Sequence, residues 1–176
     1  MSRTTAAAAV LSSSSTPLTP PAIGQVWPGQ GGIYAGIMRG APGQPDYHLI
    51  LSPKDVGQFD RMEFGEYGLH VPNADSDWDG LGNTKALLAS KREHPAAEKC
   101  AAIQHEGHND YYLPARNEAA LLYALVRDEL HASWHWTSTQ YSPHGAWVSY
   151  FNGGTQLYGL KGTGYRVRAV RRVSIQ

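Results

Sequence analysis

The chain has 176 residues, enough for one domain with a sizeable core. It carries 15 Lys and Arg against 15 Asp and Glu, and this zero net charge argues against electrostatic capture of nucleic acid or of an anionic membrane. No apolar run approaches the length that spans a bilayer, and the single cysteine, Cys100, excludes an intramolecular disulfide.

The first part of the chain is low in complexity. Ala, Ser, Thr and Pro dominate residues 1–24, and such a segment buries too little apolar area to fold alone. Three prolines within residues 17–21 favour an extended chain. We therefore expect an assembly arm over residues 1–24 that lies along a neighbouring subunit, and one folded domain over residues 25–176. A secretory signal is the alternative, because Arg3 precedes a short apolar patch at residues 6–11.

Two strands are predicted next, over residues 32–39 and 47–52. The residues between them, 40–46, are rich in Gly and Pro, which are typical of turns. The two strands are therefore expected to form a β-hairpin.

Three helices are predicted in the middle of the chain, over residues 83–92, 95–104 and 114–125. The second helix begins with Pro95, in the first turn, where a missing N–H costs nothing. The apolar face of the third helix is expected to consist of Leu121, Leu122 and Leu125.

Strands return in the last part of the chain, and they are predicted over residues 134–139, 146–151, 155–160 and 165–173. The Asn-Gly-Gly sequence at 152–154 favours a tight hairpin turn, because Asn and Gly tolerate positive φ. We expect the last strand to lie beside residues 146–151. Helices flanked by antiparallel strands indicate an α+β domain.

Two features of these strands concern the core. Trp147, Ser149 and Phe151 share one face of their strand, and the two aromatic rings are expected to be buried. The segment 165–173 carries several arginines, which we interpret as structural contacts at the rim of the sheet.

Separated sequence blocks are the most specific signal. The chain reads AAEKCAAI at 96–103, GHNDYYLPARNE at 107–118, WTST at 136–139, AW at 146–147 and YRVRAVR at 165–171. From about Gly31 to the C-terminus it resembles the family named for the C-terminal domain of the Lcl adhesin. It departs from that family at Tyr111 and Tyr112, where Asp-Trp-Arg is frequent, and at Thr137, where Ser is usual.

This resemblance implies a C-type-lectin-like fold, similar to that of phage variable receptor-binding proteins and formylglycine-generating enzymes. The family is a binding scaffold and brings no common catalytic activity with it. The enzyme alternative requires two cooperating cysteines, whereas Cys100 stands alone. We therefore expect no catalytic residues and no cofactor.

The expected ligand surface lies on the turns between the last strands. Tyr and Asn supply rigid aromatic area and adaptable hydrogen bonds, and a Tyr ring can also stack on a sugar. The alternative is a solvated loop that is rich in Tyr by chance. The candidate ligand-binding residues are Tyr141, His144, Tyr150, Asn152, Gln156 and Tyr158.

An acidic loop and a histidine loop contain residue types that can bind metal ions. Asp75, Asp77 and Asp79 followed by Gly80 resemble the opening of a calcium loop, but Ala86 stands where the closing Glu belongs. We interpret residues 79–84 as a turn and a helix cap.

His105, His108 and Asp110 do not have the helical spacing of a zinc protease, and we interpret them as polar loop groups. No metal is expected at either loop.

Together these observations predict a binding or decoration protein of a phage virion, on the tail or the head, which presents a ligand- or receptor-binding surface. Its expected partners are neighbouring virion subunits, contacted through the arm, and a host-surface glycan or protein. A homo-oligomer is expected, and a trimer is compatible with this scheme. The alternatives are a secreted adhesin-type module of the bacterial surface and a structural virion subunit without a ligand.

Overall fold

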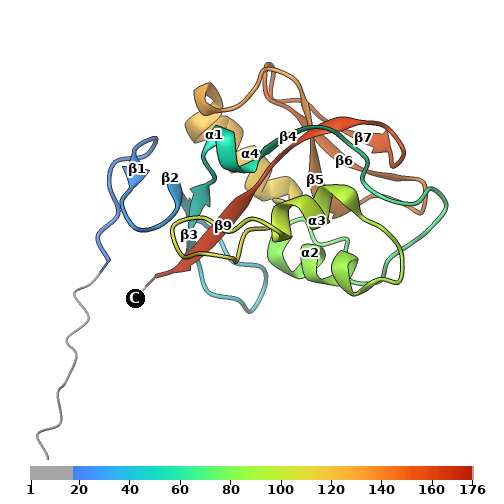
Figure 1. The fold of residues 1–176 in the computed structure, drawn as a ribbon, viewed down its shortest axis with the longest axis horizontal. Helices are drawn as coiled ribbons and strands as arrows, with labels where there is room; N and C mark the ends of the chain where they lie inside the picture. The colour runs from blue at the N-terminus through green and yellow to red at the C-terminus, as the bar shows by residue number, and fades with distance from the viewer. Residues whose placement is uncertain (1–17, 176) are drawn as a thin grey trace, which may run out of the picture.

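A computed structural model of the chain describes residues 18–175, which form an α+β domain (Figure 1). One sheet has the strand order β1-β2-β3-β9 and the other β4-β8-β5-β6-β7. The first sheet consists of β1 (Val26–Trp27), β2 (Gly32–Met38), β3 (Tyr47–Leu51) and β9 (Val170–Ser174). The second consists of β4 (Gln58–Met62), β5 (Trp134–Gln140), β6 (Gly145–Tyr150), β7 (Gln156–Leu160) and β8 (Tyr165–Arg168).

The helices of the described part are α1 (Lys54–Gly57), α2 (Gly80–Ala89), α3 (Pro95–Ala101) and α4 (Arg116–Val126), and a 3₁₀ turn follows at Arg127–Glu129. The predicted arm over residues 1–24 falls for the most part outside the described residues, which begin at Leu18.

The predicted hairpin near the start of the domain is confirmed. β2 and β3 pair antiparallel, with Ile33 opposite Leu51. The Gly- and Pro-rich loop between them is closed by the Asp46 carboxylate, which accepts a hydrogen bond from the Gly40 N–H at 3.0 Å.

The last strand was predicted in one piece beside β6, and this neighbour was wrong. The segment forms two strands in one line, β8 and β9, which connect the two sheets (red in Figure 1). β8 lies between β4 and β5, and β9 pairs with β3. Ala169 separates the two strands, and its N–H and C=O bond to Gly57 and Ser52. The partners are far away in sequence, so the turn at 152–154 carries no information about them.

The three longer helices follow the prediction with shifted ends. α2 begins at Gly80 rather than at residue 83, because the Asp79 carboxylate accepts a hydrogen bond from the Gly82 N–H at 2.9 Å and caps the helix. α3 begins at Pro95 as predicted. On α4, Leu122 is buried, but Leu125 is exposed and does not belong to the buried face.

Two apolar clusters lie on opposite faces of the five-stranded sheet. On one face, Trp136 and Val148 pack against side chains of α2 and α3. On the other face, α4 lies between the two sheets, where Leu122 contacts the cluster that contains Phe151 and Leu49. α4 covers only part of this face. The candidate site lies on the uncovered part, next to Arg116, the first residue of α4.

Candidate functional site

An irregularity in β5 fixes the neighbourhood of the site. Trp136 is opposite Val148 and Gln140 is opposite Ala146, so β5 contains two more residues than β6 between these pairs. The hydroxyl groups of the three intervening residues have separate partners. The Thr137 Oγ1 donates to the Trp147 carbonyl oxygen of β6 at 2.9 Å, and the Ser138 Oγ accepts from the Asn83 Nδ2 of α2 at 3.2 Å. The Thr139 Oγ1 donates to the Ser76 carbonyl oxygen at 2.8 Å.

The same hydroxyl group holds the beginning of α4. The Arg116 N–H donates to the Thr139 Oγ1 at 3.0 Å, and the Asn117 N–H donates to the Asp77 carbonyl oxygen at 2.9 Å. The Glu118 carboxylate accepts a hydrogen bond from the Ala115 N–H at 2.7 Å, so it satisfies another donor at this helix end. Arg116 therefore leaves the helix from an anchored backbone.

Three aromatic rings extend from Arg116 to the sheet edge, and we call Tyr141, Trp147 and Tyr158 the aromatic platform. The Arg116 guanidinium lies 3.7 Å above the centre of the Trp147 ring. The Trp147 and Tyr141 rings meet edge to face, with centroids 5.4 Å apart. Tyr141 and Tyr158 are stacked, with centroids 4.7 Å apart and planes 12° apart. Tyr141 is 55% exposed and Tyr158 is 59% exposed, so the outer half of the platform is open to solvent.

Polar groups border the platform at the Arg116 end. The Gln156 amide binds Arg116 twice: its Oε1 accepts from the Arg116 Nε at 3.0 Å and its Nε2 donates to the Arg116 carbonyl oxygen at 2.8 Å. The Asp77 carboxylate lies 3.7 Å from the same guanidinium. The surface thus offers flat apolar rings next to oriented donors and acceptors, a combination that suits a ligand with one apolar face and several hydroxyl groups.

The six predicted ligand residues lie in three places. Tyr141, Gln156 and Tyr158 come together at the platform. Tyr150 points to the opposite face of the sheet, where it stacks on Trp134 with centroids 4.8 Å apart.

The other two residues also lie away from the platform. Asn152 follows Tyr150 on the turn, and its Nδ2 is 3.4 Å from the Tyr150 hydroxyl. His144 lies against the Tyr67 ring, with centroids 4.6 Å apart.

Sequence reasoning missed Arg116 and assigned Trp147 and Asp77 to other roles. Trp147 was expected in the core, yet it is half-buried. α4 begins at Arg116, so the helix does not extend over Trp147, and the Arg116 side chain lies over the ring. Phe151 is buried as predicted. Arg116 was not singled out, and Asp77 was considered only as part of a calcium-like loop. Arg116 is the first residue of α4, and Asp77 lies three residues before the start of α2.

The basic residues of the last strands have structural partners, but they are more buried than a rim position implies. Arg168 is buried and donates to the Ser52 carbonyl oxygen at 2.5 Å. Burial lowers the pKa of Arg168 to about 10. Arg171 is also buried, and its guanidinium binds both oxygens of Asp110 at 2.8 and 3.1 Å.

A buried carboxylate lies behind the platform. Glu118 accepts hydrogen bonds from the Tyr47 hydroxyl at 2.5 Å and the Tyr112 hydroxyl at 2.6 Å. The Arg172 guanidinium lies above both of these rings and also binds Asp79 at 2.6 Å. Burial raises the pKa of Glu118, although its hydrogen bonds oppose this shift. All its contacts are internal, so this cluster joins α4 to β3 and β9.

Side chains of the acidic loop and of the histidine loop contact other groups of the protein. Asp77 and Asp79 pair with different arginines, Arg116 and Arg172. His108 lies 2.9 Å from the Gly29 carbonyl oxygen through its Nε2. Within residues 18–175, no group of three or more His, Cys, Asp or Glu side chains is placed to hold a metal ion.

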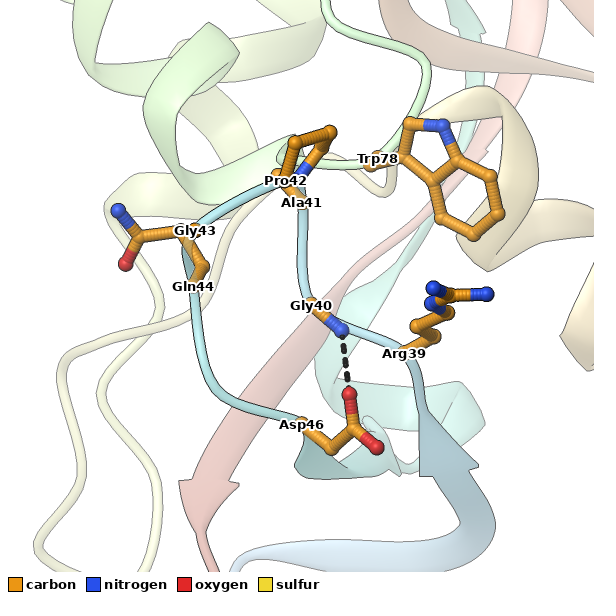
Figure 2. A pocket seen from close by; sticks show the side chains of 8 residues that line it. All are labelled: Arg39, Gly40, Ala41, Pro42, Gly43, Gln44, Asp46 and Trp78. Carbon is orange, nitrogen blue, oxygen red and sulfur yellow. Dashed lines mark hydrogen bonds between the residues drawn. The ribbon is translucent and has the colours of Figure 1, made fainter.

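A separate cavity of about 840 Å³ lies beside the β2–β3 loop (Figure 2). Arg39 and Trp78 flank it on one side, and the loop with Asp46 borders the other. Its wall is largely loop backbone, and it contains none of the predicted ligand residues. The aromatic platform therefore remains the better candidate, because it concentrates exposed rings and oriented polar groups.

Comparison with known proteins places the chain in no group. No family model matches the sequence, and the search of curated proteins finds no significant match. Among the described residues, no helix combines the length and the apolar character needed to cross a membrane.

Proposed function

We propose that the chain is a non-catalytic binding protein with a C-type-lectin-like fold, carried on a phage virion, whose aromatic platform binds a glycan of the host surface. The observation that carries this proposal is the exposed Tyr141–Tyr158 stack, which continues through Trp147 to the Arg116 guanidinium. Exposed aromatic rings near arginine are the groups that concentrate binding energy at interfaces.

The sequence blocks supply the second support. The WTST block at 136–139 forms the irregular part of β5 that holds Arg116, and the AW block at 146–147 contributes Trp147. Two of these blocks therefore contribute Trp147 and the support of Arg116, whereas Tyr141 and Tyr158 lie outside the blocks. The low-complexity segment at 1–24 supports a place in an assembled particle, because it is suited to lie along a neighbouring subunit.

The proposal is tested by removing the exposed half of the platform. The double change of Tyr141→Ala and Tyr158→Ala leaves the core untouched, because both rings are more than half exposed. Loss of one aromatic hot spot costs about 2 kcal/mol or more, so we expect Kd to rise by roughly 30-fold or more. The measurement is binding of the labelled full chain to a printed array of bacterial surface polysaccharides.

Tyr67→Ala is the matched control, because Tyr67 is 60% exposed and its ring contacts His144 rather than the platform. The control should bind as the wild type does. Unchanged binding by a folded double variant would show that the platform is not the ligand surface, and a structural virion subunit would then be the better account.

A further inference from the structure

β7 is an edge strand of the five-stranded sheet, and one row of its backbone groups points outward. One outward group, the Leu160 carbonyl oxygen, accepts from the Thr163 N–H at 2.8 Å. Its inner side pairs with β6, where the Tyr150 N–H donates to the Thr155 carbonyl oxygen and the Lys161 N–H donates to the His144 carbonyl oxygen. Because inward and outward groups alternate along a strand, the N–H groups of Gln156, Tyr158 and Leu160 point outward. Within residues 18–175 these outward N–H groups have no hydrogen-bond partner.

The two edges of this sheet differ in their protection. β4, at the other edge, carries the exposed charges of Asp60 and Arg61, its register shifts between Phe59 and Met62, and Arg61 has a φ of 55°. Charges and bulges of this kind prevent edge-to-edge pairing. β4 is therefore guarded against a further strand.

β7 has none of these devices. Residues 155–160 contain no charged residue and no Pro, and their pairing with β6 is regular from Gly145 to Ser149. The next residue, Lys161, is buried, and its Nζ donates to Leu69 and Gln140 inside the protein. Leu157 and Leu160 are more than half exposed beside the open backbone groups. An edge with these properties is a template for a further strand.

We propose that β7 pairs antiparallel with β7 of a second copy of the chain, across a two-fold axis at Tyr158. In this register the two Tyr158 residues exchange backbone hydrogen bonds, and Gln156 of one copy faces Leu160 of the other. Leu157 then faces Gly159, which has no side chain and lies against the Tyr165 and Trp136 rings. These rings occupy the place where a Gly159 side chain would lie, so Leu157 of the other copy would pack against the ring edges.

The charge of the chain does not oppose contact between two copies. The chain has a formal net charge of zero, and the strand itself is uncharged, so two copies approach without long-range repulsion. The same outward groups are used on both sides, as a two-fold contact requires.

The proposed pairing has a consequence for ligand binding, and this step rests on the proposed function. Residues that face each other in an antiparallel pair project from the same face of the sheet. The Tyr158 rings of the two copies, and with them the two platforms, would lie side by side on one surface. A repeated glycan could then occupy both, and the second contact would form at a high effective concentration.

The test measures the mass of the full chain by sedimentation velocity. Leu157→Lys places a charge at the open edge, and we expect it to halve the mass of the wild-type species. Leu88→Lys is the matched control, because Leu88 is 42% exposed on α2, and it should keep the wild-type mass. A monomeric wild type, or a Leu157→Lys variant with unchanged mass, would overturn the proposal.

A cysteine pair tests the register. Residues that exchange hydrogen bonds across two antiparallel strands have Cα atoms about 5.5 Å apart, which is within the range of a disulfide. Tyr158→Cys should therefore yield a covalent dimer under mild oxidation, whereas Leu160→Cys should not, because the two Leu160 residues lie far from the axis. Cys100 is buried and does not interfere. Equal cross-linking of both variants would overturn the two-fold contact.

The failure of this proposal and the failure of the proposed function are distinguishable. A wild-type monomer that still loses glycan binding on the double change at Tyr141 and Tyr158 would remove the β7 contact and leave the platform intact. A β7 dimer whose glycan binding is insensitive to the double change would remove the platform as the ligand site and leave the β7 contact intact.

Discussion

Buried polar side chains carry much of the specificity of this fold at the scale of single residues. Glu118, Arg168 and Arg171 are all buried, and each finds partners that belong to distant parts of the chain. Removal of one member of such a group leaves the others without compensation, which is costly in a low-dielectric interior. These residues therefore specify how the elements meet.

His135 predicts how stability depends on pH. It is 1% exposed, and burial lowers its pKa from 6.5 to about 4, with nearby Arg166 and Arg168 acting in the same direction. The folded state thus holds His135 neutral, while the unfolded chain accepts a proton below pH 6.5. Its contribution is full above pH 6.5 and is lost as the pH falls to about 4, a difference of about 3 kcal/mol.

The measurement is the free energy of unfolding in urea at several pH values between 7 and 4. His135→Asn retains a side-chain amide beside the Ser133 carbonyl oxygen but does not titrate, so the acid loss should be smaller than in the wild type. His70→Asn is the control, because His70 is exposed and is not among the groups that act on His135, and it should follow the wild-type curve. An identical pH slope in wild type and His135→Asn would refute this assignment.

The irregular part of β5 is the decisive feature at the scale of elements, because it positions α4 and with it Arg116. Thr139→Val removes the Oγ1 that donates to the Ser76 carbonyl oxygen and accepts from the Arg116 N–H. The Ser76 carbonyl oxygen keeps its hydrogen bond from the Asn83 Nδ2 at 2.7 Å, whereas the Arg116 N–H loses its partner. With shape nearly retained and this donor unpaired, the variant should lose about 1–3 kcal/mol of unfolding free energy. Urea denaturation measures this loss.

Thr155→Val is the corresponding control for this element. Thr155 is exposed, so the same exchange should change the unfolding free energy by less than about 0.5 kcal/mol. A Thr139→Val protein as stable as the control would mean that the loop at Ser76 and the start of α4 are held by other contacts.

Local signals predicted the elements of this chain better than their neighbours. The turn-rich loop at 40–46 identified the β2–β3 hairpin, and Pro95 identified the start of α3. The neighbours of β8 and β9 could not be predicted, because β8 joins β4 and β5, which lie far apart in the sequence. Strand pairing of this kind depends on the packing of the whole domain rather than on a turn.

The site could be predicted in part for the same reason. Tyr141 and Tyr158 were identified as candidates because both are amphipathic residues near turns, where binding groups are frequent. Their contact with Trp147 and Arg116 requires the register of β6 and β7 and the place where α4 begins. Alternation alone assigned Trp147 to the core, because it cannot tell where a covering helix ends.

The last two strands hold the whole molecule together, since β8 and β9 connect the two sheets. The described domain therefore closes through its own last strands. The first backbone hydrogen bonds that tie the start of the described part to β2 involve Gly24 and Gln25, and the side chains of Leu18 and Ile23 are exposed. Residues 18–21 make no backbone hydrogen bond within the described part of the chain, although Pro20 and Pro21 are half-buried.

The final prediction concerns the arm at this scale. Deletion of residues 2–21 should leave the melting temperature of the domain within about 2 °C of the wild type, because none of the described residues 18–21 belongs to the core. It should also leave the proposed β7 contact in place. If the arm lies along a neighbouring subunit, the truncated chain will no longer join the particle. Incorporation into purified virions, followed by immunoblotting, measures this, and the full-length chain is the reference. Normal incorporation of the truncated chain would assign assembly to the domain itself and remove the arm as support for the virion proposal.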